Sequence, residues 1–506
     1  MMNTEVLITG AGPTGLVLAL WLTRLGVKVR IIDKTAEAGT TSRALAVQAR
    51  TLEFYHQVGL DDAVVAGGVK IENLNLWVGG HKAARVPLQR TGEGVTPYAF
   101  ALVFPQDAHE RLLVERLTAL GIRVERRTEL LRFTQHDAGV TATLRRPDGS
   151  EESCEAAYLA GCDGASSVVR GQLNIGFPGG TYTGLFYVAD VEATGEPVHN
   201  ELHADIEDAD FLLLFSLKGD RHWRLVGNVH NLPKGENDRL EFDDVKGKAI
   251  EHLKLDIKKV NWFSTYRVHH RVALRFRDRR AFLLGDAAHI HSPVGGQGMN
   301  TGIGDAVNLA WKLAEVLKRG ASEEILDTYE PERIAFARRL VATTDRGFAF
   351  VTRRGALAAL MRKRIVPLIV PLLFRIPAMR RLLFSTVSQT KVNYRDSTLS
   401  AGAAGKVRGG DRLPWVKLAS GEDNFAPLTS LAWQVHIYGE AGRGVGEACA
   451  ELRLPLHAFK WESGMQRAGL AKGAMYLVRP DGYVALADPN DDPGRLRQYF
   501  VRNLTG

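Results

Sequence analysis

Three glycines near the start of the chain have the spacing of a turn that binds a nucleotide. Gly10, Gly12 and Gly15 lie between the apolar run Val6 to Ile8 and an apolar run that begins at Leu16. In such a turn the first glycine allows a tight bend, the second lets the backbone approach a pyrophosphate, and the third lets a helix pack against the strand. The N–H groups at the start of that helix stabilise phosphate. The spacing therefore predicts a dinucleotide site, with FAD and NAD as alternatives.

Three carboxylates could complete this site. Asp33 ends a second short strand expected at residues 27–32, where a carboxylate can accept hydrogen bonds from ribose hydroxyls. Asp163 and Asp286 also follow apolar strands, and ligands collect where parallel strands end at one sheet edge. A glycine-rich loop then leads into a helix expected over residues 302–317, whose N-terminus would stabilise a second patch of negative charge. A reduced flavin carries such a charge.

An α/β framework has to position these residues. The first strand, the glycine turn, a helix and the second strand form one strand-helix-strand unit. A helix over residues 109–120 and later short strands extend it; the strands are expected at 122–126, 130–135, 140–145 and 157–162. Residues from about 177 to 275 have alternating apolar segments instead. They predict a separate antiparallel sheet that covers the cofactor.

Length and composition describe an ordinary globular protein with more than one domain. The chain has 506 residues, 45% of them hydrophobic and 24% charged, with a net charge of +8. The basic residues are scattered, so anionic small molecules are favoured at least as much as nucleic acid, and no nucleic-acid partner is expected. Cys154, Cys162 and Cys449 have no metal or redox spacing. We therefore expect a cytoplasmic protein without a bound metal.

No signal peptide or integral membrane span is expected. Glu5 and the glycine turn interrupt the N-terminus before an apolar signal region can form. The longest apolar candidate, Ile365 to Phe374, is broken by Pro367 and Pro371 and flanked by arginines. A buried or interfacial segment between domains is favoured there over a membrane contact.

The glycine turn, Asp163-Gly164 and Gly285-Asp286 together resemble the class A FAD-dependent aromatic hydroxylases, a family typified by para-hydroxybenzoate hydroxylase and phenol hydroxylase. The resemblance covers about residues 4–345 and extends into the tail. It implies that Asp33 holds the adenosine ribose, although many relatives have Glu there. It also implies that Arg43 and Gln106 contact the diphosphate or ribityl region, and that Asp286 holds ribityl hydroxyls.

The resemblance implies further contacts with non-covalent FAD. Asp163 would serve both FAD and the reducing pyridine nucleotide, and Pro293 would lie beside the isoalloxazine, with the backbone near Gly295 and Gly296 close to the flavin. The full expected set of cofactor-binding residues is Gly10, Gly12, Pro13, Thr14, Gly15, Asp33, Lys34, Arg43, Gln106, Leu130, Asp163, Asp286, Pro293, Gly298, Met299 and Asn300.

The same resemblance implies a fold of three parts. The first is a Rossmann-like FAD-binding domain of residues 1–75, 105–176 and 276–345, interleaved with an antiparallel-sheet substrate domain of residues 76–104 and 177–275. A helical linker of residues 346–395 leads to a thioredoxin-like domain of residues 396–506. That domain has no Cys-x-x-Cys, so we expect it to be structural or to form a homodimer.

The implied function is that of a monooxygenase. NADPH or NADH would reduce FAD, and O2 would form a C4a-hydroperoxyflavin that hydroxylates a phenolic or polycyclic aromatic substrate. Epoxidation and Baeyer-Villiger insertion remain alternatives, as do, at lower weight, an NAD-dependent dehydrogenase and a non-catalytic protein that binds flavin and an aromatic compound. No catalytic base is assigned; the side chains considered are His289, His291, Tyr182 and Tyr266, each of which also has a structural explanation.

Overall fold

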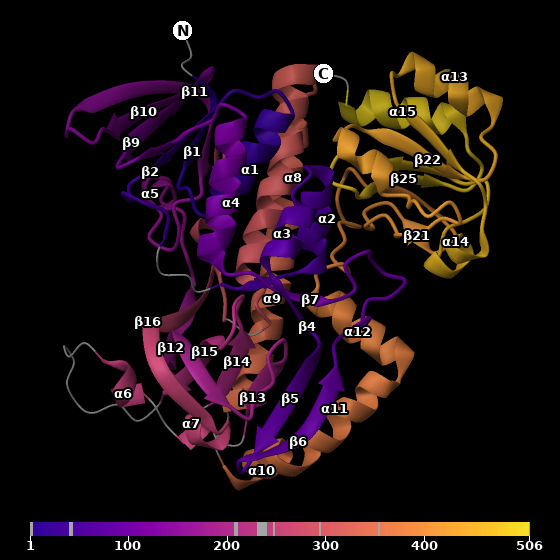
Figure 1. Ribbon diagram of the computed structural model, residues 1–506. Coiled ribbons are helices and arrows are strands. Elements are labelled where there is room, and N and C mark those ends of the chain that lie inside the picture. Colours follow the sequence, from indigo (N-terminus) through magenta and orange to yellow (C-terminus); the bar gives the residue numbers. More distant parts are fainter. Residues whose placement is uncertain are drawn as a thin grey trace.

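A computed structural model describes residues 4–39, 44–206, 211–229, 240–245, 248–292, 295–352 and 355–504 (Figure 1). Two expected cofactor contacts, Arg43 and Pro293, lie outside the described residues. The chain forms a mixed α/β fold built on three larger sheets and one small one.

The first sheet carries the glycine turn and has the order β17-β18-β11-β1-β2-β8. β1 pairs in parallel with β2 and β11, and β11 pairs in parallel with β18, so these strands end at the same edge. An antiparallel hairpin of β9 and β10 extends from β11. The strands are β1 (Thr4–Thr9), β2 (Val29–Asp33), β8 (Val124–Arg126), β9 (Glu129–His136), β10 (Gly139–Arg145), β11 (Glu151–Gly161), β17 (Arg277–Asp278) and β18 (Ala281–Leu283).

Helices cover this sheet, and α1 packs along α8 at the centre of the molecule (Figure 1). α1 is buried from Gly15 to Leu22 and α8 is buried over most of its length, as their apolar sequences require. The helices of this region are α1 (Pro13–Arg24), α2 (Ala49–Gln57), α3 (Asp61–Gly67), α4 (Gln106–Ala119), α5 (Val168–Gln172), α8 (Gly298–Arg319) and α9 (Tyr329–Thr352), with the 3-10 turns η1 (Gly285–Ala287) and η2 (Glu323–Thr328).

Two helices begin earlier than the sequence pattern predicts. α8 begins at Gly298 rather than at residue 302, because the Thr301 amide donates to the Gln297 carbonyl and closes one more turn. α4 begins at Gln106 rather than at residue 109. Gln106 therefore lies in the first turn of a helix and not in the loop before it.

The second sheet, of mixed but mainly antiparallel strands, lies below the first in Figure 1 and has the order β19-β16-β12-β15-β14-β13-β5-β6. A small sheet of β3, β7 and β4 lies between the two. The strands are β3 (Ala46–Val47), β4 (Val69–Ile71), β5 (Asn73–Val78), β6 (His81–Pro87), β7 (Ala101–Val103), β12 (Gly179–Gly195), β13 (Leu202–Asp205), β14 (Leu212–Ser216), β15 (His222–Val229), β16 (Leu255–Val272) and β19 (His289–Ile290). Two short helices, α6 (Phe242–Val245) and α7 (Lys248–His252), precede β16.

The C-terminal part forms a third sheet at the right of Figure 1, in the order β21-β20-β25-β24-β22-β23. β22 is parallel to β23, whereas β24 is antiparallel to both β22 and β25. Its elements are β20 (Ala401–Ala404), β21 (Val407–Arg408), η4 (Ala426–Ser430), β22 (Gln434–Tyr438), α13 (Arg443–Glu451), β23 (Leu456–Phe459), α14 (Ser463–Ala468), β24 (Met475–Val478), β25 (Val484–Asp488) and α15 (Pro493–Leu504).

Between α9 and this sheet the chain forms α10 (Ala356–Leu360), a π-helical turn η3 (Met361–Ile365), α11 (Val366–Arg375) and α12 (Pro377–Val387). One side of α11 packs on β6, but Leu368, Ile369 and Leu372 are exposed. The segment was expected to be buried or interfacial; one face packs on β6 and the other is exposed. Among the described residues, no helix is long and apolar enough to cross a membrane.

Candidate cofactor and active site

The glycine turn has the geometry that its spacing predicts. Gly10 has a φ of +96°, and a Cβ there would lie 2.2 Å from the carbonyl oxygen of Cys162. A Cβ on Gly15 would lie 2.0 Å from the carbonyl oxygen of Gly10. A Cβ on Gly12 would meet no atom within 4 Å. The protein itself thus excludes side chains at Gly10 and Gly15, whereas the space beside Gly12 is open.

Thr14 contacts two segments that lie far from it in the sequence. A Cβ on Gly285 would lie 2.7 Å from Thr14 Oγ1, and a Cβ on Gly302 would lie 2.3 Å from the same oxygen. The start of α1 therefore touches both the Gly285-Asp286 turn and the first turns of α8. All three segments come to one place on the molecule.

The N-termini of α1 and α8 both lack a capping side chain. Gly12 is the N-cap of α1 and Pro13 is its first residue, and the first turn contains no acid. α8 likewise has no capping side chain and no acid in its first turn, which holds Gly298, Met299 and Asn300. Uncapped N–H groups and the positive end of each helix dipole suit bound anions.

Asp33 lies at the end of β2 and is hydrogen-bonded to the turn. Its Oδ2 accepts from the Ala11 amide at 2.6 Å, and its Oδ1 accepts from the amide and hydroxyl of Thr35 at 2.8 and 2.6 Å. A carboxylate has about four acceptor positions, so capacity for one more donor remains. Lys34, the next residue, is exposed.

Asp163 carries a buried oxygen for which the described part of the chain supplies no donor. Its Oδ2 accepts from the amides of Val168 and Val169 at 2.7 and 3.2 Å, at the start of α5. Its Oδ1 is buried and has no hydrogen-bond partner among the residues that the structure describes. A Cβ on Gly10 would lie 3.0 Å from the Asp163 Cα, so the backbone of Asp163 lies beside the glycine turn. A buried acceptor without a donor fits a site completed by a ligand.

The other expected contacts have different surroundings. Asp286 is exposed in η1. Gln106 donates to Glu110 at 2.8 Å and accepts from the Ala44 amide at 3.4 Å, so it lies beside the loop before β3. Burial raises the pKa of Glu110. Leu130 is buried in the core at the start of β9.

The side chain of Asn300 forms hydrogen bonds with two separate segments of the chain. Its Nδ2 donates to the carbonyls of Ala46 and Gly296, both at 2.9 Å, and its Oδ1 accepts from the Gln48 amide at 2.8 Å. Gln48 in turn donates to the Gly295 carbonyl at 3.0 Å. The sequence predicted Asn300 only as a cofactor contact, and the structure adds that its side chain holds the Gly295–Gly296 loop against β3.

Asp305, on α8, supports the Gly285-Asp286 turn from inside the protein. It is fully buried and accepts from the Gly285 amide at 3.0 Å, from His289 Nε2 at 2.7 Å and from Arg333 Nε at 2.6 Å. Burial alone would raise the pKa of Asp305, but Arg333 and His289 hold it below its usual value. Sequence reasoning missed this residue; the available signal was an acid within an otherwise apolar stretch of the expected helix.

The four side chains considered as bases are held by protein contacts. His289 is paired with Asp305, and Tyr182 donates to Asp345. Burial lowers the pKa of His291 to about 4, and its Nε2 has no partner in the described part of the chain. Tyr266 packs against Phe186, with ring centroids 5.8 Å apart. None of these contacts identifies a catalytic base.

Among the described residues, no cluster of His, Cys, Asp and Glu side chains could hold a metal ion. Cys154, Cys162 and Cys449 are free thiols, and burial raises the pKa of Cys162 well above its usual value. The site therefore consists of backbone amides, helix N-termini and carboxylates. That set suits an organic cofactor with phosphates and hydroxyls.

Comparison with known proteins gives matches along most of the chain. The FAD binding domain family matches residues 3–344. The 6-methylpretetramide 4-monooxygenase of Streptomyces rimosus is 34% identical over 516 residues, which cover 95% of this chain and 90% of that protein. The dialkyldecalin synthase of Streptomyces rugosporus is 31% identical and covers 97% of both chains. The solved structure of the OxyS anhydrotetracycline hydroxylase from Streptomyces rimosus has a TM-score of 0.79 at 28% identity and covers 99% of both chains.

Proposed function

The chain belongs to the family of FAD-dependent aromatic hydroxylases, and from that premise we propose that it uses NAD(P)H and dioxygen to hydroxylate a phenolic or polycyclic aromatic substrate. The observation that carries the proposal is the contact of Thr14 with both Gly285 and Gly302. It joins the glycine turn to the second glycine-rich segment, and one extended cofactor needs both.

We propose that FAD is held without a covalent bond by the following groups. The uncapped start of α1 would hold the pyrophosphate, Asp33 the adenosine ribose, and the exposed Asp286 the ribityl hydroxyls. The start of α8 would place its N–H groups near the pyrimidine edge of the ring. The chemistry that FAD supplies when bound is transfer of electrons from NAD(P)H to dioxygen, so that one oxygen atom enters the substrate and the other leaves as water.

The second sheet provides an apolar surface for an aromatic substrate. Leu45 packs in one cluster with Val188 and Val226 of this sheet, while a Cβ on Gly296 would lie 2.6 Å from the Ala46 Cβ. The cluster thus begins at the loop expected to lie beside the flavin. Its partly buried members include Phe215, Trp262 and Tyr266. An apolar wall of this kind excludes water and orients a flat ring.

The division into domains is part of the same proposal. The C-terminal unit runs strand, helix, strand, helix, two strands and helix from β22 to α15, with the order β25-β24-β22-β23, which supports a thioredoxin-like assignment. Cys449 is its one cysteine, so we propose a structural role. β5 begins at Asn73, so the substrate sheet would start slightly before the expected boundary at residue 76. A homodimer is tested by analytical ultracentrifugation.

The test is a screen of phenols and polycyclic quinones with the purified, FAD-loaded protein. We expect a flavin absorption spectrum, oxidation of NADPH or NADH that an accepted compound stimulates, and a product heavier by one oxygen atom. With ¹⁸O2, that atom should carry the label. NMR of the product separates hydroxylation from epoxidation and Baeyer-Villiger insertion. A protein that binds FAD but never accelerates NAD(P)H oxidation with any compound would contradict the proposal.

One comparison favours a second candidate, in which the bound flavin does not transfer oxygen. The dialkyldecalin synthase is named for a synthase reaction and not for a monooxygenase, although it matches this chain along its whole length. In that case the substrate would be converted with no gain of an oxygen atom and no consumption of NAD(P)H. The mass measurement therefore separates the two candidates.

A further inference from the structure

A row of large apolar side chains is exposed along the helices that follow α9. The exposed fractions are 75% for Leu357, 52% for Leu360, 68% for Leu368, 55% for Leu372 and 51% for Ile376. Spacings of three, eight and four residues from Leu357 to Leu372 put these four side chains on one side of the helical segment, and Ile376 follows as the extended residue between α11 and α12. Single exposed apolar residues are common, but an aligned row is not.

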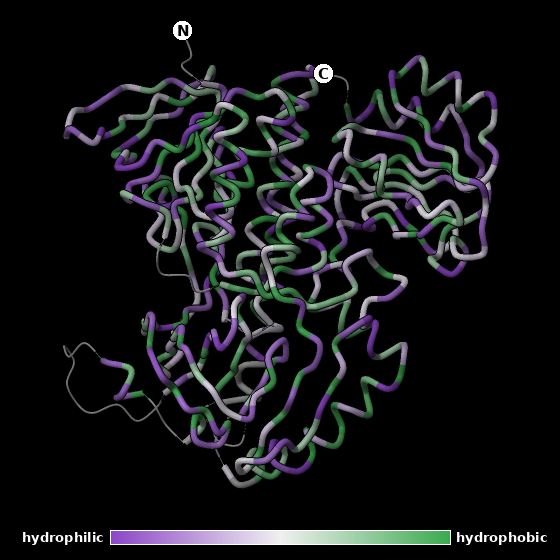
Figure 2. Tube along the Cα trace, in the orientation of Figure 1, coloured by the Kyte–Doolittle hydropathy of each residue, from purple (hydrophilic) through white to green (hydrophobic). Residues whose placement is uncertain are grey.

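The same helices carry positive charge only. Residues 356–387 include six basic residues and no acidic one, and the wider stretch 346–395 contains no Asp or Glu. Arg364, Arg375 and Arg381 are exposed next to the apolar row. Purple and green alternate along this segment in Figure 2, at the place that Figure 1 labels α11 and α12.

The opposite side of the segment is attached to the protein. α11 packs on β6, Pro367 is buried, and a Cβ on Gly92 would lie 2.2 Å from the Phe384 ring of α12. The exposed row therefore faces away from the body of the protein. Strand β6 adds the exposed Lys82, and the nearest turn contributes one acid, Glu93.

We propose that α10, α11 and α12 dock on the surface of an anionic lipid bilayer. Helices with an apolar face and a basic rim lie in the plane of the membrane interface, with the apolar face among the acyl chains and the cations at the headgroups. No described helix could span a bilayer, which agrees with docking from one side. A second copy of the chain is a poor occupant, because two all-positive segments would repel one another. The inference does not rest on the proposed function, since it requires neither catalysis nor a substrate.

The test is co-sedimentation of the FAD-loaded protein with lipid vesicles. We expect binding at least tenfold tighter to vesicles of phosphatidylglycerol and phosphatidylcholine than to phosphatidylcholine alone, and weaker binding in high salt. The double variant L368D/L372D should lose at least tenfold in affinity. R364E/R375E should remove the preference for the anionic lipid.

The matched control is Val501→Asp, which places the same charge on an apolar residue that is 60% exposed on α15 in the C-terminal unit. It should bind vesicles like the unchanged protein. Thermal melts and flavin absorption of all variants should be unchanged, because the substituted side chains are exposed. Equal binding to both vesicle types, or full binding by L368D/L372D, would overturn the proposal. The proposal would also be overturned if the protein formed concentration-dependent dimers that L368D/L372D abolished. It would equally be overturned if the protein bound an acidic protein and no lipid vesicles.

Discussion

At the scale of single residues, a side chain added at Gly12 should affect cofactor binding but not folding. Its φ is −75° and a Cβ there meets no protein atom within 4 Å, so Gly12→Ala should fold with unchanged thermal stability. The added methyl group would occupy the space that a pyrophosphate approaches. We expect FAD affinity to fall at least tenfold, measured by quenching of flavin fluorescence during titration of the apoprotein.

The matched control for this prediction is Gly446→Ala in α13, where a Cβ also meets nothing within 4 Å. It should leave FAD affinity unchanged and raise the free energy of unfolding by about 0.5–1 kcal/mol, because alanine favours a helix more than glycine does. A contrast is Gly15→Ala, which should destabilise the protein because of the 2.0 Å approach to the Gly10 carbonyl oxygen. Unchanged FAD affinity in Gly12→Ala would show that no phosphate lies beside this residue.

A second prediction at this scale concerns Asp305→Asn. The substitution leaves the buried guanidinium of Arg333 without its counter-charge and weakens the support of Gly285. Breaking a buried pair by removing one partner typically costs about 3–5 kcal/mol, so we expect a loss of this size in urea unfolding and a lower FAD affinity. Glu447→Gln, in an exposed pair with Arg443, should change the free energy of unfolding by less than about 0.5 kcal/mol.

Sequence reasoning predicted the turn residues well but not the residues that support them. Gly15 lies against the Gly10 carbonyl and Asp33 accepts from the Ala11 amide, so these contacts stay within the first strand-helix-strand unit and their spacing is informative. Asp305 and Arg333 act through partners on different helices, and a single sequence does not show which helices pack together. The same holds for the side chain of Asn300.

At the scale of elements, strand β22 should give part of the protein a marked sensitivity to acid. His436 is fully buried there, and burial together with the nearby His457 lowers its pKa from 6.5 to about 3. The folded state holds this imidazole neutral, while the unfolded chain binds a proton below pH 6.5. Its contribution is therefore complete above pH 6.5 and is lost as the pH falls toward 3.

Between pH 7 and pH 5 this single group should lower the free energy of unfolding by about 2 kcal/mol. In His436→Asn the difference between the two pH values should be smaller by that amount, measured by urea unfolding of the C-terminal unit. His81→Asn, on the exposed strand β6, is the control and should keep the full difference. An unchanged difference in His436→Asn would contradict the prediction.

Element types were easier to predict than element ends. The strands of the first sheet follow their apolar runs, but α8 begins four residues early because tertiary contacts of the loop, including those of Asn300, favour the extra turn. The apolar segment at residues 365–374 was expected to be buried or interfacial, and hydropathy alone could not show that only one face packs on β6. The sequence pattern predicts that a helix has an apolar face. It does not predict which part of the protein covers that face.

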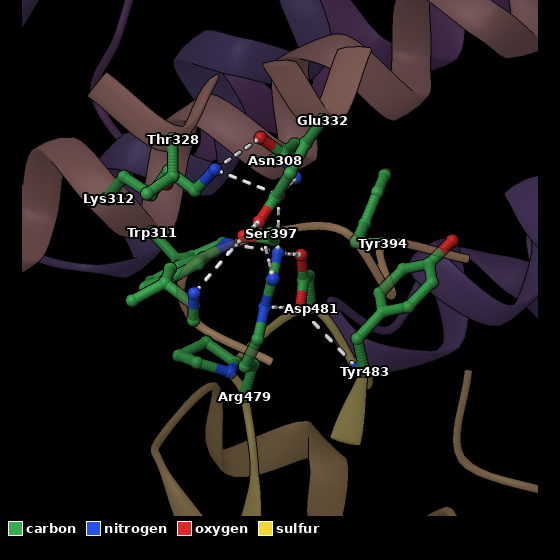
Figure 3. A network of polar contacts seen from close by, with 12 residues as sticks. Asn308, Trp311, Lys312, Thr328, Glu332, Tyr394, Ser397, Arg479, Asp481 and Tyr483 are labelled. Carbon is green, nitrogen blue, oxygen red and sulfur yellow. Dashed lines mark hydrogen bonds and ion pairs between the residues drawn. The ribbon is translucent and has the colours of Figure 1, made fainter. Parts of the chain in front are cut away.

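At the scale of the whole molecule, a buried network of charges joins the C-terminal unit to α8 and α9 (Figure 3). Glu332 accepts from Lys312 at 2.9 Å, from Arg479 at 2.9 and 3.0 Å and from Ser397 at 2.7 Å. Arg479 also bonds Asp481 at 2.6 Å. Burial alone would raise the pKa of Glu332, but the two cations lower it, while burial lowers that of Lys312 to about 8.

Glu332→Gln should weaken this junction more than any exposed pair could. The variant leaves Lys312 buried without a carboxylate, so we expect a loss of about 3–5 kcal/mol and faster proteolysis between α12 and β20. Limited proteolysis with mass spectrometry measures the second effect. Glu451→Gln, whose exposed partner is Arg497, should be digested like the unchanged protein. Identical digestion of Glu332→Gln would show that the network does not hold the units together.

The overall division into an α/β part, a second sheet and a C-terminal unit could be predicted, since each has its own pattern of apolar residues. The way the units are joined could not. Arg412, for example, reaches Glu53 on α2 at 2.6 and 2.8 Å across 359 positions of the chain. No local pattern records such a pairing.

The turn from Gly10 to Gly15 has supporting contacts within the protein: Asp33 accepts from the Ala11 amide, and Gly10 lies against the Cys162 carbonyl. A binding site that is ordered by contacts within the protein loses little conformational entropy when its ligand binds. We would then expect FAD to exchange reversibly and the protein to fold without it. The apoprotein could then be reconstituted with a flavin analogue, which would change the reactivity of the enzyme without a mutation.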